Sequence, residues 1–114
     1  MQIENFERTR GNTWEKELEF YNDNGPIDIT GWIILFTAKE KISDIDAVAK
    51  MSKTITVHSE PLSGKTNLIL TASDTNITPG SYIYDIKIIT SSGSELTIVN
   101  GTFTILSGVT LRDS

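Results

Sequence analysis

The segment SYIYDIKIIT, which runs from Ser81 to Thr90, decides the predicted fold. Its side chains alternate between two faces, one made of Tyr82, Tyr84, Ile86 and Ile88 and the other of Ile83, Asp85, Lys87 and Ile89. A period of two residues is the pattern of a β-strand, and the face that is apolar throughout must lie against a core. The loop SSGS, Ser91 to Ser94, follows directly and predicts a hairpin to the next strand.

Further segments show strand patterns, separated by turn signals at intervals of roughly ten residues. Together with the first, they span Thr13–Phe20, Trp32–Lys39, Thr54–His58, Lys65–Leu70, Ser81–Thr90, Glu95–Val99 and Thr102–Ile105. We expect Asn100-Gly101 to form a tight turn or a bulge between the last two. Lys41–Met51 breaks the alternation, and the spacing of its apolar residues indicates a short helical excursion.

Strands of this number and spacing predict an all-β protein, an antiparallel β-sandwich of immunoglobulin type with about seven strands. A small barrel is the alternative. The 114 residues fit one domain over 1–114, with a tail at 106–114 that is free to be flexible. The predicted core consists of the large apolar residues that face inward on each strand: Trp14, Leu18, Phe20, Trp32, Ile34, Phe36, Leu68, Leu70, Tyr82, Tyr84, Ile86, Leu96, Ile98, Phe103 and Ile105.

Composition narrows the classes of function. The formal net charge is −5, and the basic residues are scattered, which disfavours binding to nucleic acid or to an anionic membrane. The absence of cysteine excludes disulfides and thiolate metal sites. The longest apolar run, Trp32 to Phe36, is far shorter than a membrane-spanning helix requires, and the polar N-terminal segment does not look like a signal peptide.

The acidic stretch NDNGPIDITG, Asn22 to Gly31, is a candidate site for a metal ion. An EF-hand is excluded, because alignment on Gly25 places Phe20 at the first ligand position and Gly31 at the last. A looser calcium site is the remaining metal hypothesis, with Asp23, Asn24 and Asp28 as its ligands. We favour a structural turn, made by Asp23, Asn24, Gly25, Pro26 and Asp28, which directs the chain into the strand that starts at Trp32.

Other candidate catalytic residues have simpler explanations. The single histidine, His58, is expected at a strand edge in solvent, and no nucleophile elbow accompanies it. Glu15, Glu17 and Glu19 share one face of a strand, where like charges favour solubility and protect the edge more often than they catalyse glycoside hydrolysis. SGKT, Ser63 to Thr66, lacks the first glycine of a phosphate-binding loop and precedes a strand. We therefore expect neither enzyme activity nor a cofactor.

Two central strands also carry apolar side chains on the face opposite the core. If these strands are neighbours, Ile33, Leu35, Ile83 and Ile89 form an outward apolar strip, because a sandwich buries only one face of each sheet. Such a strip marks contact with another subunit or domain. The alternative is that the Lys41–Met51 excursion or a terminal segment covers it.

Four ordered segments resemble the immunoglobulin-like domains of tailed-phage structural proteins. They are RGNTWEKELEF from Arg10, NDNGPIDITGWIILFTAKE from Asn22, SGKTNLILTASDTNITPGSYIYDIKII from Ser63 and SSGSELTIVNGTFTIL from Ser91. The nearest similarity is to the N-terminal domain of baseplate upper proteins, and it covers most of the chain, from about Arg10 to Thr110. Those proteins continue into a long C-terminal region, whereas this sequence stops at Ser114.

The resemblance implies a non-enzymatic structural module of a phage or prophage virion, in the tail or baseplate. Its expected partners are other virion proteins and copies of itself in a homo-oligomer, with neither nucleic acid nor membrane. Its expected location is the virion, or the host cytoplasm before assembly. The alternative is a carbohydrate-binding or host-adhesion module that contacts a glycan through the loops at one end of the sandwich.

Overall fold

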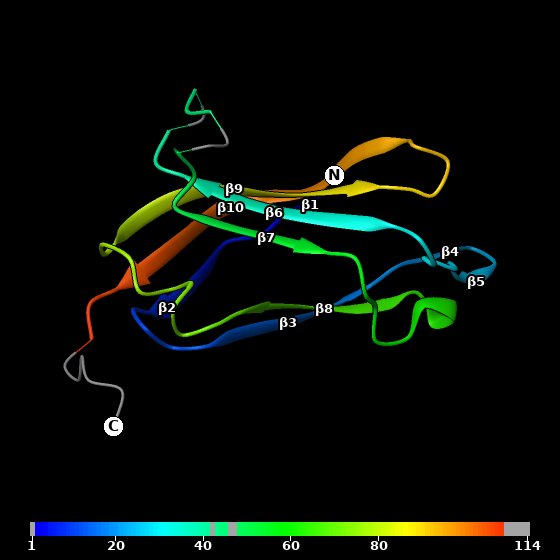
Figure 1. The fold of residues 1–114 in the computed structure, drawn as a ribbon, viewed down its shortest axis with the longest axis horizontal. Coiled ribbons are helices and arrows are strands. Elements are labelled where there is room, and N and C mark those ends of the chain that lie inside the picture. The colour runs from blue at the N-terminus through cyan, green and yellow to red at the C-terminus, as the bar shows by residue number, and fades with distance from the viewer. Residues whose placement is uncertain (1, 42, 46–47, 109–114) are drawn as a thin grey trace.

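The strands of this protein lie in two layers (Figure 1), and the apolar core lies between them. The computed structural model describes residues 2–41, 43–45 and 48–108. Its elements are β1 (Gln2–Ile3), β2 (Phe6–Thr9), β3 (Trp14–Glu19), β4 (Tyr21–Asn22), β5 (Gly25–Pro26), β6 (Ile33–Lys39), β7 (Met51–Ile55), a 3₁₀ turn (Pro61–Ser63), β8 (Lys65–Leu70), β9 (Gly80–Ile89) and β10 (Glu95–Leu106). The all-β prediction is confirmed.

The large sheet is curled and mixed, with the strand order β1-β10-β9-β6-β7. β2 also pairs with β10, and both β1 and β2 run parallel to it, while β9 pairs antiparallel with β10 and with β6. The small sheet is the antiparallel pair β3–β8, and β4–β5 is a separate short hairpin. Among the described residues the large sheet is open at β7, so it does not close into the barrel that the sequence left as an alternative.

The core lies between these sheets and is organised by aromatic rings. Trp14 from the small sheet packs edge-on against Phe103 of β10, with ring centroids 5.1 Å apart. Phe6 of β2 completes the contact, 5.0 Å from Trp14 and 5.5 Å from Tyr84. Phe36 of β6 packs 5.6 Å from Tyr84 on the other side. These five rings tie four strands of the large sheet to the small one.

The structure buries most of the predicted core residues but not all of them. Phe20, Trp32 and Ile98 are half-buried and pack at the margin of the core. The prediction was wrong for Leu96, which is 60% exposed. Leu96 pairs with the buried Ile88 and so faces inward, but the small sheet has only two strands and leaves this end of β10 uncovered.

Strand boundaries differ from the prediction at both ends of the chain and at β7. The N-terminal strands β1 and β2 were missed, because the sequence FERT offers only one apolar residue to reveal its inward face. Asn100-Gly101 is not a turn, since β10 runs through it as one strand, and its register shift falls instead between Thr97 and Val99. β7 starts at Met51, earlier than the predicted Thr54.

The predicted helical excursion and the tail lie partly outside the described residues. In Lys41–Met51, residues 42, 46 and 47 are not described. Val48 has a 3₁₀-helical conformation, Met51 begins β7, and the other described residues form turns, bends or irregular structure. In the tail, Leu106 belongs to β10, and 109–114 are not described.

Gly101 allows the N-terminal segment to cross over β10. A Cβ at this position would lie 2.0 Å from the carbonyl oxygen of Glu4 and 2.8 Å from the side-chain oxygen of Asn5. The same crossing is held by hydrogen bonds: Glu4 N donates to Asn100 O, and Thr102 N donates to Asn5 Oδ1, each at 3.0 Å. Only glycine leaves enough room for this backbone contact.

β3 and β7 each carry a lysine that faces inward, and each is an edge strand of its sheet. Lys16 shares the inner face of β3 with Trp14, and its ammonium lies 3.9 Å from Glu4 of the large-sheet layer. Lys53 shares the inner face of β7 with Met51 and lies 2.8 Å from Asp74, which follows β8. Inward charges of this kind discourage indiscriminate pairing of strand edges with other chains.

The first prediction concerns Gly101. Gly101→Ala should lower the free energy of unfolding by about 2 kcal/mol more than Gly80→Ala, because the new methyl group meets the Glu4 carbonyl. Gly80 is a matched control: its φ is 154°, against 157° at Gly101, but it has open space around the added Cβ. Urea denaturation measures both, and equal losses would show that the crossing is not tight.

The second prediction concerns pH and Asp74. Partial burial raises the pKa of the Asp74 carboxyl, but hydrogen bonds from Lys53 and Thr71 outweigh it and hold the pKa below its ordinary 3.8. A lowered pKa stabilises the fold above the unfolded-state value, and this stability is lost as the pH falls through the folded-state pKa. Asp74→Asn should therefore cost at most about 1 kcal/mol at neutral pH and flatten the decline in stability below about pH 4.

Urea unfolding at a series of pH values measures this effect. Lys53→Gln, which removes the partner and keeps the carboxyl group, should lower stability at neutral pH to a similar degree. If the stability of Asp74→Asn declined below about pH 4 as steeply as that of wild type, Asp74 would not be the group responsible for the decline.

Candidate functional site

The outer face of the large sheet carries the residues that the sequence singled out as an interface. The register places Ile33 opposite Ile89, Leu35 opposite Lys87, Thr37 opposite Asp85 and Lys39 opposite Ile83. β10 adds Thr97 beside Lys87 and Asn100 beside Asp85. Laterally paired residues point to the same side of a sheet, so these pairs form successive rows across β6, β9 and β10.

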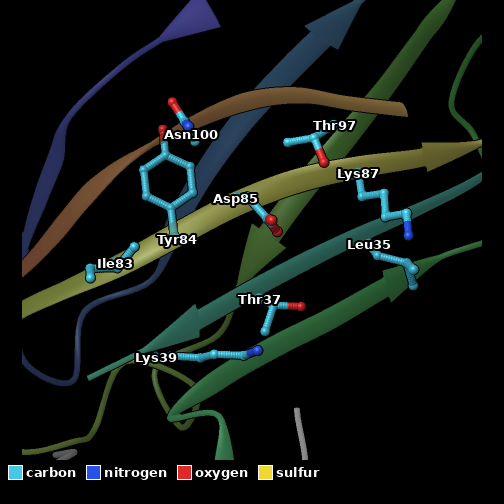
Figure 2. A pocket seen from close by; sticks show the side chains of 9 residues that line it. All are labelled: Leu35, Thr37, Lys39, Ile83, Tyr84, Asp85, Lys87, Thr97 and Asn100. Atoms are coloured by element: carbon cyan, nitrogen blue, oxygen red, sulfur yellow. The ribbon is translucent and has the colours of Figure 1, made fainter. Parts of the chain in front are cut away.

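A hollow of about 350 Å³ lies in this face (Figure 2). Its lining residues are Leu35, Thr37, Lys39, Ile83, Tyr84, Asp85, Lys87, Thr97 and Asn100. The middle row, Thr37, Asp85 and Asn100, has short side chains, and the rows on either side carry the longer Leu35, Lys87, Ile83 and Lys39. The hollow therefore follows from the difference in side-chain length along the two central strands.

The four predicted interface residues do not form one continuous strip. Ile33 and Leu35 are on the same strand and Ile89 pairs with Ile33, so these three make a contiguous, half-buried apolar patch. Ile83, which is 40% exposed, lies beyond the polar Thr37–Asp85 row. The role of all four as an interface stays a prediction.

Two lysines at the rim of the hollow are fixed by hydrogen bonds. The Lys39 ammonium donates to the backbone oxygen of Asp44 at 2.9 Å. Lys87 contacts the Glu95 carboxylate at 2.8 Å, and this hydrogen bond, together with the lysine charge, lowers the pKa of Glu95. The rim therefore presents charged groups in defined positions around a lining of apolar, hydroxyl, amide and carboxylate groups.

Sequence reasoning missed the polar half of this site. It found Ile33, Leu35, Ile83 and Ile89 because apolar side chains facing away from the core are anomalous. Asp85 and Lys87 occupy the same outward parity as Ile83 in the strand that decided the fold, which was an available signal. Thr97 and Asn100 could not be placed beside them, because the register shift in β10 separates them by three residues rather than two.

The structural turn is formed by local hydrogen bonds. Asn22 Oδ1 accepts from Asn24 N at 2.8 Å within the β4–β5 hairpin. Asp28 Oδ1 accepts from Thr30 N at 2.9 Å and from the Thr30 hydroxyl at 2.6 Å, and these bonds lower the Asp28 pKa. In the described part of the chain, no group of three or more acidic, histidine or cysteine residues is arranged to hold a metal ion.

His58 is not the solvent-exposed residue that was expected. Its ring is half-buried, with Nε2 2.8 Å from the Trp32 carbonyl oxygen and Nδ1 2.9 Å from the Thr66 hydroxyl. A carbonyl only accepts, so Nε2 carries a proton and the ring links the start of β6 to β8. This contact explains His58 as a structural residue. Glu15, Glu17 and Glu19 are exposed along the outer side of β3, as their alternation predicted.

No family model and no curated protein matches the chain. Among the described residues, no helical segment has the length and apolar character that crossing a membrane requires.

Proposed function

We propose that this protein is a non-enzymatic assembly module, an immunoglobulin-like β-sandwich of a phage or prophage virion that acts in the tail or baseplate. It makes protein–protein contacts through the outer face of β6, β9 and β10. The resemblance of four ordered segments to phage structural domains supports the virion assignment. The arrangement of strands in two layers around one core is compatible with the sandwich.

One observation carries the proposal of an assembly surface. The apolar patch of Ile33, Leu35 and Ile89 lies on the outer side of the two central strands, beside a hollow with charged residues at its rim. Interfaces combine an apolar centre with polar groups that fix orientation, and this face offers both. The strands beneath it are anchored by the aromatic core, so the surface is held rigid before a partner binds.

Charge favours selective contacts over indiscriminate ones. The formal net charge of −5 makes copies of the protein repel one another unless a specific interface outweighs the repulsion. The partners that this face fits are other virion proteins or, in a symmetric arrangement, the same face of a second copy.

The third prediction tests this face. Leu35→Ser combined with Ile83→Ser should abolish oligomers, or complexes with the products of neighbouring genes, because both side chains lie on the proposed contact surface. Ile69→Ser is the matched control: Ile69 is 41% exposed on β8, in the other sheet, against 40% for Ile83. Sedimentation velocity over a range of micromolar concentrations measures the association.

Wild type and Ile69→Ser should associate equally, and the double variant should remain monomeric with an unchanged circular dichroism spectrum. A wild-type protein that stays monomeric both alone and with the neighbouring gene products would contradict the proposal. Binding to a glycan array, with no protein partner, would support the adhesion alternative instead.

A further inference from the structure

The small sheet has an unpaired edge at β3. β3 pairs with β8 on one side only, and no other described strand joins this sheet. Phe20 N donates to Gly64 O at 2.8 Å, so the backbone of Phe20 points toward the β8 side. Because N–H and C=O groups alternate sides along an antiparallel strand, the backbone groups of Glu15, Glu17 and Glu19 point away from β8 toward the free edge.

A groove of about 380 Å³ runs beside this edge. Its apolar lining is Leu18 and Phe20 from the small sheet with Ile98 and Val99 from β10, and its charged lining is Glu4, Lys16, Glu17 and Glu19. Earlier on β10, Leu96 faces inward at 60% exposure with no strand of the small sheet over it. The groove is thus the place where a third strand of the small sheet would cover the large one.

We infer that this groove accepts an extended strand from a partner protein, in which apolar residues alternate with lysine or arginine. Strand addition to a sheet edge derives affinity from backbone hydrogen bonds and specificity from alternate side chains. Inward side chains of the added strand lie on Ile98 and Val99. Outward side chains lie beside Glu15, Glu17 and Glu19, which are exposed on the outer side of β3.

The charge of the groove selects a basic partner. Lys16 lies 3.9 Å from Glu4 and offsets its charge, so Glu17 and Glu19 leave the rim negative. Opposite charges on laterally paired positions of a sheet attract, and like charges repel. A strand with lysine or arginine at the outward positions therefore pairs favourably along the whole edge.

The same charges exclude a second copy of β3 as the occupant. In an antiparallel pair centred on Glu17, Glu17 would face itself and Glu15 would face Glu19 of the other copy. A slip by one residue would relieve this repulsion only by turning the apolar side chains to solvent. The occupant is consequently a different, basic segment, and this surface is separate from the outer face of the large sheet.

The fourth prediction tests the groove in the full chain with a synthetic peptide. The probe is a capped peptide of alternating lysine and valine with the length of β3, titrated into labelled protein and followed by NMR. The backbone amides of Glu15, Glu17 and Glu19 should shift and become protected from hydrogen exchange. Glu17→Lys should weaken binding by about tenfold, because one attractive pair becomes repulsive.

Glu7→Lys makes the same charge change at another exposed strand glutamate, on β2, and should leave the affinity unchanged. A glutamate–valine peptide should not bind wild type, and a lysine–valine peptide N-methylated on its pairing edge should lose affinity. The inference is overturned if the probe fails to bind, if Glu17→Lys and Glu7→Lys weaken it equally, or if the shifts map to β7 instead. The double variant Leu35→Ser, Ile83→Ser should bind the probe as wild type does. Binding of the peptide at β3 and assembly through the outer face of the large sheet can therefore be tested separately.

Discussion

The contact on which the fold depends is the packing of Trp14 against Phe6 and Phe103. A two-stranded sheet such as β3–β8 is too small to be stable by itself. Trp14 anchors it to both β2 and β10 of the large sheet, with its ring centroid 5.0 Å from that of Phe6 and 5.1 Å from that of Phe103. Aromatic pairs at such distances add to the free energy of burial, so one residue of the small sheet links β3 to the neighbouring β2 and to β10, which is distant in sequence.

Both proposed surfaces follow from this anchoring. The large sheet is covered on its inner side by only two strands, which leaves one corner of its inner face open beside β3. Its outer face is uncovered by any other described strand and presents the patch of Ile33, Leu35 and Ile89. One face therefore suits broad contact with a folded partner, and the β3 edge suits an extended segment. A module with two such surfaces can join a folded neighbour to a flexible arm of another protein.

The sequence predicted the strands whose inward residues are consistently apolar. The prediction failed for strands in which few of the inward residues are apolar. The strand at Ser81–Thr90 was located almost to the residue, because its four inward apolar side chains alternate strictly. Phe6 was missed because a single aromatic residue among charged neighbours gives no period. Asn100-Gly101 was misread as a turn, because the close approach of Glu4 that demands this glycine depends on contacts with the N-terminus. At the candidate site, the outward isoleucines could be predicted from the alternation alone. The polar row that separates Ile83 from the others could be identified only once the pairing of β6, β9 and β10 was known.

The parallel pairing of β1 and β2 with β10 has a consequence for synthesis of the protein. Asn5 bonds Thr102, 97 positions away in the sequence, so β1 and β2 find their partner β10 only after the strands between them have been made. Such long-range pairing slows folding. Until Phe103 has been made, Trp14 and Phe6 lack the ring that completes their packing. The docking of β10 between β9 and the β1–β2 segment therefore completes this core.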